Sequence, residues 1–229
     1  MKTVVITGSA RGFGLAMLKE FRKYNYNVVV TDVNEDNLKK AKKELNEIGS
    51  VGEILSIKCD VTKEDDINEL IKETVNEFNT IDIWINNAGV NQLMNPVWNL
   101  DEDIIDKLID IDLKGTILCS KLIMKTMIKQ GFGTIYNIEG FGSNDQKHVG
   151  LTIYGTAKRG VTYFTETLAH EVNRFKNIYI GKITPGIMIT NFLFHSSFSF
   201  GCMKPMGFLL GRLWCSDCSS ANAVLIASS

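Results

Sequence analysis

Two residues of this sequence have the chemistry of an acid/base pair, the phenol of Tyr154 and the ammonium group of Lys158. They stand four positions apart in a segment with helical apolar spacing, and residues four apart share one face of an α-helix. A free tyrosine has a pKa of about 10, so it exchanges protons poorly near neutral pH. A neighbouring cation and the positive N-terminal end of a helix both favour the phenolate and lower that pKa. The pair is therefore a candidate general acid/base, the alternative being an ordinary solvated pair on a helix surface.

A glycine-rich turn near the N-terminus has the spacing of a phosphate-binding loop. Residues 2–7 are apolar and β-branched, as a strand buried on both faces should be, and they lead into Gly8, Gly12 and Gly14. Such glycines let the chain turn sharply and let a pyrophosphate approach the amides that open the next helix, which is predicted over residues 12–24. Glycines alone are weak evidence, because tight turns need them anyway. Their position between a strand and a helix is what indicates dinucleotide binding.

The second predicted strand, residues 27–32, ends in Asp32 at about the expected 20 residues beyond the glycines. A carboxylate there can accept hydrogen bonds from both adenosine ribose hydroxyls and would repel a 2′-phosphate, which favours NAD over NADP. Arg11 argues for NADP, because a cation just before Gly12 could pair with that phosphate. We weight Asp32 more heavily. An arginine side chain can easily turn away, whereas the repulsion between a carboxylate and a 2′-phosphate in contact is hard to avoid.

Polar residues also follow the later predicted strands. Asp60 comes after the third strand and is either an adenine contact or a turn residue. Two adjacent amides, Asn86 and Asn87, close the fourth strand. Buried amides are costly unless they are matched, so they should bond neighbouring strands or a ligand. A fifth strand, residues 133–138, leads into the glycine-rich loop 139–143.

Predicted strands alternate with predicted helices along the chain. The remaining elements are helices over residues 35–49, 62–78, 101–130 (one helix or a broken pair) and 154–175, and a sixth strand over residues 178–184. Repeated βα units form a parallel sheet with helices on both faces, and ligands bind outside the carboxyl ends of its strands. The sequence therefore predicts an α/β protein with a doubly wound parallel sheet in three layers (α/β/α) and a single domain.

Composition excludes several classes of protein. The chain has 229 residues, of which 45% are hydrophobic and 22% charged, and a net charge of −1, so it can bury a large core and has no basic excess for nucleic acid or an anionic membrane. No apolar run approaches the roughly 20 residues of a membrane span, and the N-terminal one is too short for a signal peptide. Five cysteines without a disulfide pattern predict a reducing, cytoplasmic location. Cys215 and Cys218 lack a second pair of ligands, so no metal site is predicted.

Together these motifs resemble the short-chain dehydrogenase/reductase family, whose members have a Rossmann fold. The matching motifs are Thr7-Gly8-x-x-x-Gly12-x-Gly14, Asp60-Val61, Asn86-Asn87-Ala88-Gly89, Tyr154-x-x-x-Lys158 and Pro185-Gly186-x-x-x-Thr190. They span about residues 1–192, which form the predicted dinucleotide-binding and catalytic domain. From about His195 the family character fades. We interpret residues 193–229 as a divergent, truncated or frame-shifted end of the same domain, with a functional tail as an equal alternative.

The resemblance implies a role for each matched residue. Tyr154 would exchange a proton with the substrate oxygen, while Lys158 would lower the pKa of Tyr154 and hold the nicotinamide ribose. The residues implied in cofactor binding are Gly8, Ser9, Arg11, Gly12, Phe13, Gly14, Asp32, Val33, Asp60, Val61, Asn87, Ala88, Gly89, Tyr154, Lys158, Pro185, Gly186, Ile187 and Thr190. The first turn would cradle the pyrophosphate, residues 87–89 would line the adenosine side, and residues 185–190 would contact the nicotinamide end.

Two catalytic positions depart from the family pattern. The usual serine would fall within residues 137–140, Asn-Ile-Glu-Gly, which offer no hydroxyl. Ser143 is the nearest substitute, either as a donor to the substrate oxygen or as a plain turn serine, and its loop is similar to that of the chlorophyll b reductase branch. Asp112 replaces an asparagine whose backbone carbonyl holds a water of a proton relay. We expect the Asp112 carboxylate near Lys158, where it would partly offset the pull of the ammonium on Tyr154 and set the pH optimum for oxidation high.

The predicted function is that of an NAD(P)-dependent oxidoreductase, with Tyr154, Lys158, Ser143 and Asp112 as catalytic residues acting on an alcohol or carbonyl group. A pigment, a sugar, a polyol and an acyl-chain ketone are equally open as substrates. The competing interpretation is an NAD(P)-binding regulator with little turnover, although retention of both Tyr154 and Lys158 argues against it. Apolar stripes on the long helices, partly through the resemblance, also predict a homodimer or homotetramer.

Overall fold

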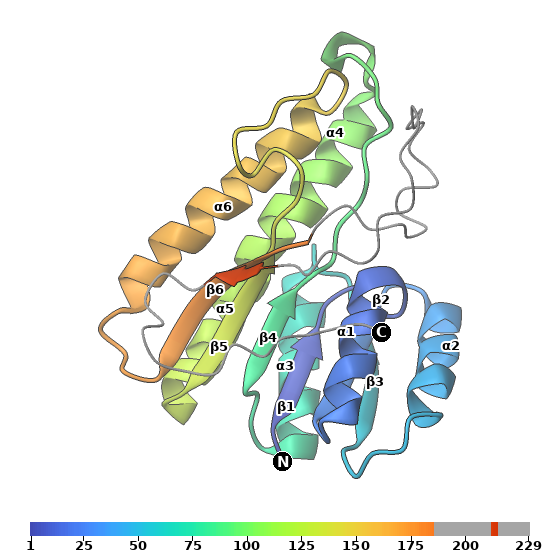
Figure 1. Cartoon of the computed structure of the whole chain (residues 1–229), viewed down its shortest axis with the longest axis vertical. Coiled ribbons are helices and arrows are strands. Elements are labelled where there is room, and N and C mark those ends of the chain that lie inside the picture. Colours follow the sequence, from blue (N-terminus) through green and yellow to red (C-terminus); the bar gives the residue numbers. More distant parts are fainter. Residues whose placement is uncertain (186–211, 215–229) are drawn as a thin grey trace.

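The computed structural model describes residues 1–185 and 212–214, which form one α/β unit around a central sheet (Figure 1). The strands are β1 (Thr3–Ile6), β2 (Asn27–Asp32), β3 (Ile54–Lys58), β4 (Ile83–Asn86), β5 (Gly133–Ile138), β6 (Ile178–Thr184) and β7 (Arg212–Trp214). Their order is β3-β2-β1-β4-β5-β6-β7, with β1 to β6 parallel and β7 antiparallel to β6. The strand order reverses between β1 and β4, which is where a doubly wound sheet binds its ligand. The predicted fold class is confirmed.

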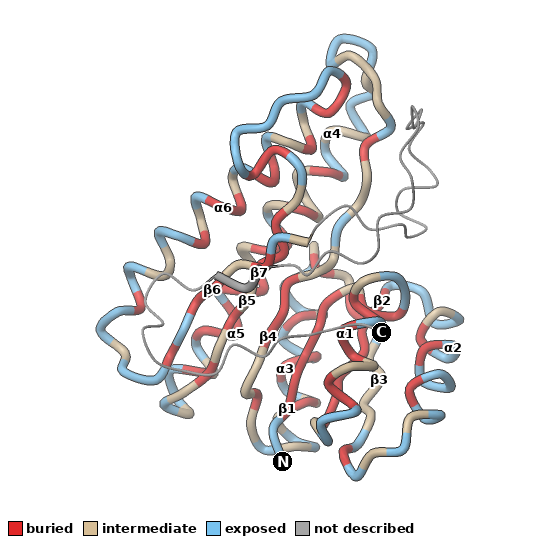
Figure 2. Tube along the Cα trace, in the orientation of Figure 1, coloured by how far each residue is buried: buried red, intermediate tan, exposed pale blue. Residues whose placement is uncertain are grey.

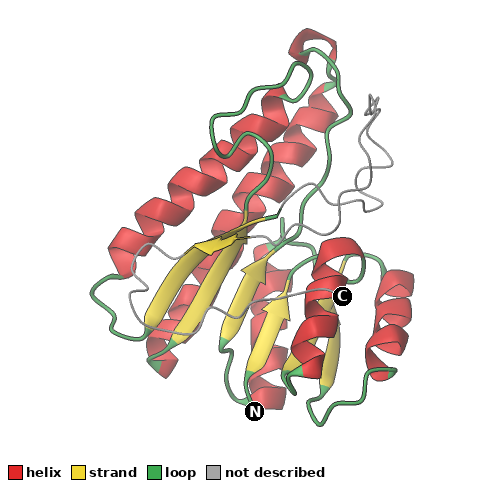
Figure 3. Cartoon of the chain, viewed as in Figure 1, coloured by secondary structure: helices red, strands yellow, loops and turns green. Residues whose placement is uncertain are grey.

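Helices lie on both faces of this sheet (Figure 3). The helical elements are α1 (Gly12–Lys23), α2 (Glu35–Asn46), α3 (Glu64–Phe78), η1 (Val97–Asn99), α4 (Glu102–Leu108), η2 (Ile109–Gly115), α5 (Thr116–Gln130) and α6 (Thr152–Val172). Alternate strand residues face opposite layers, so Val4 and Ile6 pack with α1 and α2, whereas Val5 packs with α3, α5 and the end of α6. This gives two hydrophobic cores, one on each face.

Burial follows the same layering (Figure 2). Every residue of β1 and β2 is buried, and the exposed residues gather on the outer faces of the helices and in the loops. Continuous apolar strands are expected of a parallel sheet that is covered on both sides. Trp84, Met124 and Met127 are among the buried core residues.

The predicted helix over 101–130 is one helical run with a π-helical segment inside it. α4 passes into η2, a π-helix of 7 residues, and η2 passes into α5. π-helical turns widen the helix locally and occur often at functional sites. The segment contains Asp112, and Gly115 at its end lies so close to Val61 that a Cβ would overlap the valine side chain. α4 and the N-terminal part of α6 extend beyond the carboxyl ends of the strands (Figure 1).

A buried polar network fixes the neighbouring ends of β4 and β5. The Asn86 side chain donates to Asn137 Oδ1 over 2.7 Å and to Ser120 Oγ over 2.9 Å, and it accepts from the Trp84 indole. Asn137 donates in turn to the hydroxyl of Thr165 on α6, over 2.8 Å. The expectation that Asn86 bonds a neighbouring strand is thus confirmed. These bonds hold the two strands and both long helices in register below the candidate site.

Candidate active site

The β1–α1 turn is shaped by glycines for two different reasons. Gly8 has a φ of +59°, and a Cβ there would lie 2.8 Å from Ala88 Cα. A Cβ on Gly14 would lie 2.6 Å from Asn87 Nδ2 and 2.7 Å from Ser9 Cα. A Cβ on Gly12, by contrast, would meet no atom within 4 Å. Gly8 and Gly14 therefore allow close packing, while open space remains at Gly12, over the first amides of α1, where the phosphates of a dinucleotide would fit.

The segment after β4 is bonded directly to this turn. Thr7 Oγ1 accepts from the amides of Asn87 and Ala88, each over 3.0 Å. The Asn87 side chain donates to the carbonyls of Thr7 and Gly8 over 2.9 and 3.0 Å. Asn87 and Ala88, which were predicted on the adenosine side of a cofactor, thus lie against the glycine turn.

Several predicted cofactor residues use their side chains within the protein. The Ser9 hydroxyl donates to Ile6 O and accepts from Thr31 N, and the Ser9 amide donates to Thr31 O. Asp60 Oδ1 accepts from the amide and the hydroxyl of Thr62, so Asp60 takes the turn role that the sequence left open. Phe13 and Val61 pack into the cores, whereas Val33 is exposed. A contact of these residues with a cofactor remains a prediction.

The two residues that bear on NAD or NADP binding differ in exposure. Asp32 is buried at the end of β2, and its Oδ1 accepts from Asn34 N over 2.9 Å. Arg11 is exposed at the N-terminus of α1. Asp32 is therefore held in place by its own turn, as a group that binds ribose hydroxyls must be.

Tyr154, Lys158 and Asp112 come together inside the protein. All three are buried, and Lys158 Nζ lies 3.1 Å from Asp112 Oδ2 and 5.6 Å from the centre of the Tyr154 ring. The other carboxylate oxygen of Asp112 accepts from Val90 N over 2.8 Å, and the Asp112 carbonyl accepts from the Thr116 hydroxyl. The expected proximity of the Asp112 carboxylate to Lys158 is confirmed, and it is a buried ion pair.

Lys158 and Asp112 shift the pKa of Tyr154 in opposite directions. Burial raises the pKa of the Tyr154 phenol, the Lys158 cation lowers it and the Asp112 carboxylate raises it, so that the pKa lies above its ordinary value. The prediction that the lysine and the helix end lower this pKa is wrong, because burial, which exists only in the folded chain, outweighs the lysine, and Asp112 offsets the lysine as expected. Burial lowers the pKa of Lys158, but Asp112 and Tyr154 raise it more, so this lysine remains a cation. The phenol is therefore neutral at physiological pH.

Gly140 lies directly against the Tyr154 hydroxyl. A Cβ on Gly140 would overlap that hydroxyl and would also lie 3.1 Å from Lys158 Cγ. The missing serine therefore has a steric reason, because no side chain fits at this position while Tyr154 keeps its place.

Ser143 is bonded within its own turn. Its hydroxyl donates to Gly140 O over 2.6 Å, and its carbonyl accepts from Arg159 Nη1 over 2.7 Å. This is the turn role that the sequence left as the alternative. A bond from the Ser143 hydroxyl to a substrate oxygen would require the bond to Gly140 to open, so that role remains a prediction.

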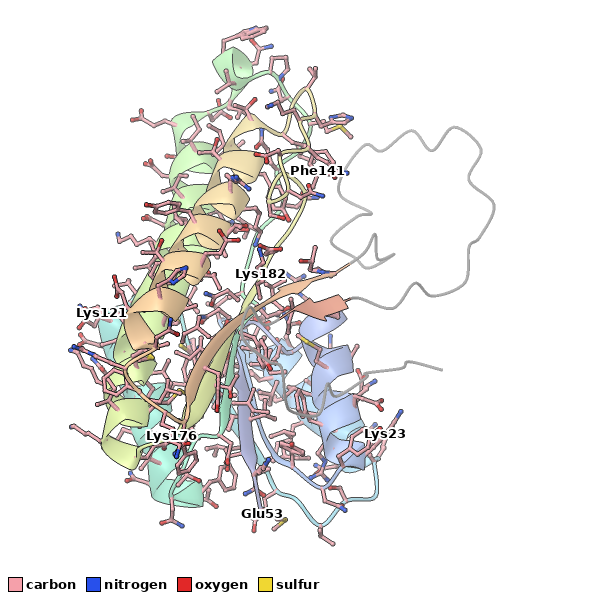
Figure 4. The ribbon with its side chains drawn as sticks, turned by 60° about the vertical axis from the view of Figure 1, so that its left-hand side comes forward. Lys23, Glu53, Lys121, Phe141, Lys176 and Lys182 are labelled. Carbon is pink, nitrogen blue, oxygen red and sulfur yellow. The ribbon has the colours of Figure 1, made fainter. Side chains whose placement is uncertain are left out.

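Glu139 is a buried carboxylate beside this loop that was not predicted as a site residue. Glu139 accepts from the Thr162 hydroxyl over 2.8 Å and the Thr184 hydroxyl over 2.6 Å, and it lies 3.3 Å from Lys182 Nζ. Figure 4 labels Lys182 on β6 and, on the loop above it, Phe141. Glu139 thus ties the end of β5 to α6 and β6, immediately before Gly140. An acidic residue at the end of an apolar strand was the only signal in the sequence.

Part of the predicted site lies beyond the described residues. Pro185 is half-buried directly after β6, whereas Gly186, Ile187 and Thr190 fall outside the described ranges, as do Cys215 and Cys218. Within residues 1–185, no group of three or more metal-binding side chains is found. None of the described helices has the length and apolar character needed to cross a membrane.

Comparison with known proteins identifies relatives over most of the chain. The model of the family described as short chain dehydrogenase matches residues 2–197. A rice (Oryza sativa subsp. japonica) protein named probable chlorophyll(ide) b reductase NYC1, chloroplastic, is 32% identical over 212 residues, which cover 86% of this chain and 42% of the rice protein. The chlorophyll(ide) b reductase NOL, chloroplastic, of Arabidopsis thaliana is 35% identical over 196 residues, which cover 83% of this chain and 56% of that protein. The chain spans about half the length of these curated relatives. The similarity to their branch, which was inferred from the 140–143 loop, is confirmed.

Solved structures show the same architecture. Levodione reductase superposes with a TM-score of 0.79 at 28% identity, over 84% of this chain and 74% of that one. A xylitol dehydrogenase with bound NAD+ gives 0.75 at 29% identity, over 81% and 70%. A metagenomic short-chain oxidoreductase in complex with NADP gives 0.74 at 25% identity, over 81% and 82%.

Proposed function

This chain belongs to the short-chain dehydrogenase/reductase family, and from that premise we propose that it transfers a hydride between a nicotinamide cofactor and an alcohol or carbonyl group. The observation that carries the proposal is the buried cluster of Tyr154, Lys158 and Asp112, with Lys158 Nζ 3.1 Å from Asp112 Oδ2. A lysine and an aspartate can pair anywhere in a protein. Here the pair lies beside a neutral tyrosine at the carboxyl ends of the strands, where the glycine turn also lies.

The residues present fit a dinucleotide. Gly8, Gly12 and Gly14 with the first amides of α1 would hold the pyrophosphate, and Asp32 would hold the adenosine ribose. Lys158 would bind the nicotinamide ribose, beside Tyr154. When bound, the nicotinamide would supply the hydride chemistry, for which amino-acid side chains have no equivalent.

The protein would contribute the proton and the environment. In the reductive direction the neutral phenol of Tyr154 donates a proton to the substrate oxygen as negative charge develops there, and in the oxidative direction the phenolate accepts it. Lys158 stabilises that phenolate, and Asp112 balances the charge of Lys158. Because burial and Asp112 raise the pKa of Tyr154, the phenol is ready to act as a donor at neutral pH, and oxidation is favoured at higher pH. Burial of the cluster keeps bulk water from competing for the proton.

The preferred cofactor would be NAD. Asp32 is buried at the end of β2 and held by Asn34 N, so it cannot swing away from a 2′-phosphate without breaking that bond. Arg11 is exposed, and the mobility of an exposed arginine makes its pull on a phosphate weaker than the repulsion from a fixed carboxylate.

An assembly of two or four copies would bury residues that α5 and α6 leave in water. Most apolar residues of these helices pack on the sheet, but Ile128 is 42% exposed and Tyr163 is 73% exposed. Light scattering after gel filtration would give the mass in solution. A monomer at micromolar concentration would contradict this part of the proposal.

The direct experiment is a fluorescence titration with NADH and NADPH, followed by a panel of carbonyl substrates. We expect saturable binding of NADH, weaker binding of NADPH and consumption of NADH with at least one ketone or aldehyde. Binding without turnover on any member of a broad panel, which includes pigment, sugar and acyl-chain carbonyls, would favour a regulatory protein. Absence of nucleotide binding would refute the proposal entirely.

A further inference from the structure

Gln92 is a fully buried amide that lies between two segments far apart in the sequence. Its exposed fraction is 0%, and both polar ends of the side chain are bonded. Oε1 accepts from the backbone amide of Tyr154 over 2.9 Å, and Nε2 donates to the carbonyl of Gly150 over 2.8 Å. A buried amide with both ends satisfied is fixed in one orientation.

The bond to Tyr154 replaces a missing helix cap. The first amides of a helix have no carbonyl partner within it, and a side chain at the N-cap usually accepts from the second or third of them. α6 begins at Thr152, so Tyr154 is its third residue, and the N-cap residue Leu151 offers no capping side chain. Gln92 therefore caps α6 from 62 positions away, at the backbone of the candidate acid/base itself.

The segment that carries Gln92 also contacts the rest of the site. Asn87 bonds the carbonyls of Thr7 and Gly8 in the glycine turn. Three residues later, Val90 N donates to the carboxylate of the Asp112–Lys158 pair. Residues 87–92 thus touch, in order, the glycine turn, the buried ion pair and the Tyr154 backbone.

We propose that Gln92 is a positioning residue for Tyr154, acting through its acceptor bond to the Tyr154 amide. This inference rests on the proposed function, since it assigns Gln92 a part in the same reaction. Tyr154 is the group that must reach the substrate oxygen, and it has little room, because its hydroxyl already lies against Gly140. Loss of the cap frees the first turn of α6 and lets the phenol move out of line. A misplacement of about 1 Å at a catalytic group can reduce a rate about 10²-fold.

The test compares substitutions of two amide side chains that lie close together in the sequence, Gln92 and Asn95. Gln92→Met keeps the shape of the side chain but removes both bonds. Gln92→Glu keeps an acceptor for Tyr154 N, and in the neutral form that full burial favours it also keeps a donor for Gly150 O. Asn95→Leu is the control, because the Asn95 side chain donates to Asn99 O at the end of η1 rather than to α6.

We expect Gln92→Met to reduce kcat for carbonyl reduction about 10- to 100-fold while the Kd of NADH stays within twofold. Gln92→Glu should remain within a few-fold of the parent protein, and Asn95→Leu should equal it. Full kcat in Gln92→Met would overturn the inference. Equal losses of kcat and of NADH affinity in Gln92→Met and Asn95→Leu would also overturn it, since that pattern indicates general damage to the loop.

Hydrogen exchange separates this inference from the proposed function. The Tyr154 amide should exchange faster in Gln92→Met than in the parent protein, and at the parent rate in Gln92→Glu and Asn95→Leu. That readout needs neither cofactor nor turnover. An unchanged exchange rate in Gln92→Met would refute the capping role even in an active enzyme. Lack of any reductase activity in the parent protein would refute the proposed function while the exchange result still decided the capping role.

Discussion

The β1–α1 turn and the Tyr154 cluster both lie at the carboxyl ends of the strands, but they are built from different kinds of contact. The turn relies on backbone atoms and on the absence of side chains at Gly8 and Gly14. The Tyr154 cluster relies on buried polar side chains, including an ion pair between residues 46 positions apart. Backbone amides keep their properties whatever the neighbouring residues are. The pKa of a buried phenol depends on every charge around it.

This difference explains where the chain departs from its family. The glycine turn, Asp32 and residues 86–89 all keep the family pattern, whereas Gly140, Ser143 and Asp112 all belong to the Tyr154 side. A change in the turn would close the space that a dinucleotide needs. Around Tyr154, one change can be offset by another, because charge and space there are shared among several side chains. We therefore expect variants of the turn to alter binding, and variants around Tyr154 to alter rate and pH dependence.

The largest effect on stability should come from Asp112→Asn. The side chain of Lys158 is 7% exposed, and removal of its partner leaves a buried charge without compensation. Breaking such a pair typically costs about 3–5 kcal/mol of the free energy of unfolding. Chemical denaturation would measure this loss, with Asp110→Asn as the control, because Asp110 pairs with Lys114 on the surface of the same π-helical segment.

The same variant tests the pH dependence of the reaction. Oxidation needs the phenolate, so its rate rises as the pH passes the pKa of Tyr154. The Asp112 carboxylate is one of the groups that raise that pKa, so its removal should move the rising limb to lower pH. An unchanged profile for Asp112→Asn would show that its charge is not felt at Tyr154.

A serine at position 140 should harm the enzyme, although the family usually has one in this loop. Its Cβ would overlap the Tyr154 hydroxyl and displace it, so we expect Gly140→Ser to lower kcat about 10²-fold with little change in NADH affinity. Gly49→Ser is the control, since a Cβ there meets no atom within 4 Å. A gain of activity in Gly140→Ser would mean that Gly140 is simply a lost serine and that our steric explanation is wrong.

Gly14→Ala should change the affinity for NADH more than kcat, the reverse of Gly140→Ser. Its methyl group would displace Asn87 and Ser9, and with them the surface that faces the pyrophosphate. We expect the Kd of NADH to rise at least about tenfold, or about 1.4 kcal/mol, with a smaller change in kcat at saturating cofactor. Calorimetry of Gly14→Ala beside Gly49→Ala would check this. A loss of kcat at unchanged affinity would break the distinction between the two regions.

The smallest effect should come from Asp32→Asn. The amide keeps an oxygen for a ribose hydroxyl but no longer repels a 2′-phosphate, so the affinity for NADPH should approach that for NADH. Parallel titrations would measure the ratio of the two dissociation constants. A ratio that Asp32→Asn leaves unchanged would assign the cofactor preference to another residue.

Much of the fold could be predicted because its signals are local. The six parallel strands are predicted from short apolar runs, and the helices from their apolar spacing. Both patterns can be recognised within a window of a few residues. The predicted ends of the helices were less accurate than their existence and type. α2 stops at Asn46 rather than residue 49, and the run over 101–130 contains a π-helical segment that no residue spacing signals.

The candidate site was predictable where its chemistry is local, or where the family resemblance supplied a distant partner, as it did for Asp112 and Lys158. The glycine turn and the Tyr154–Lys158 pair are each readable from one short segment. Gln92 and Glu139 were missed because their partners lie on other elements and no motif connects them. The direction of the pKa shift at Tyr154 was wrong for the same reason, since burial is a property of the folded chain.

The central claim is that Tyr154 is the proton donor and acceptor beside a bound nicotinamide. The most direct measurement is turnover and NADH affinity of Tyr154→Phe on the same preparation, because phenylalanine removes only the hydroxyl. Our account predicts that turnover is abolished while the Kd of NADH stays within a few-fold of the parent value. Full turnover in Tyr154→Phe would contradict it.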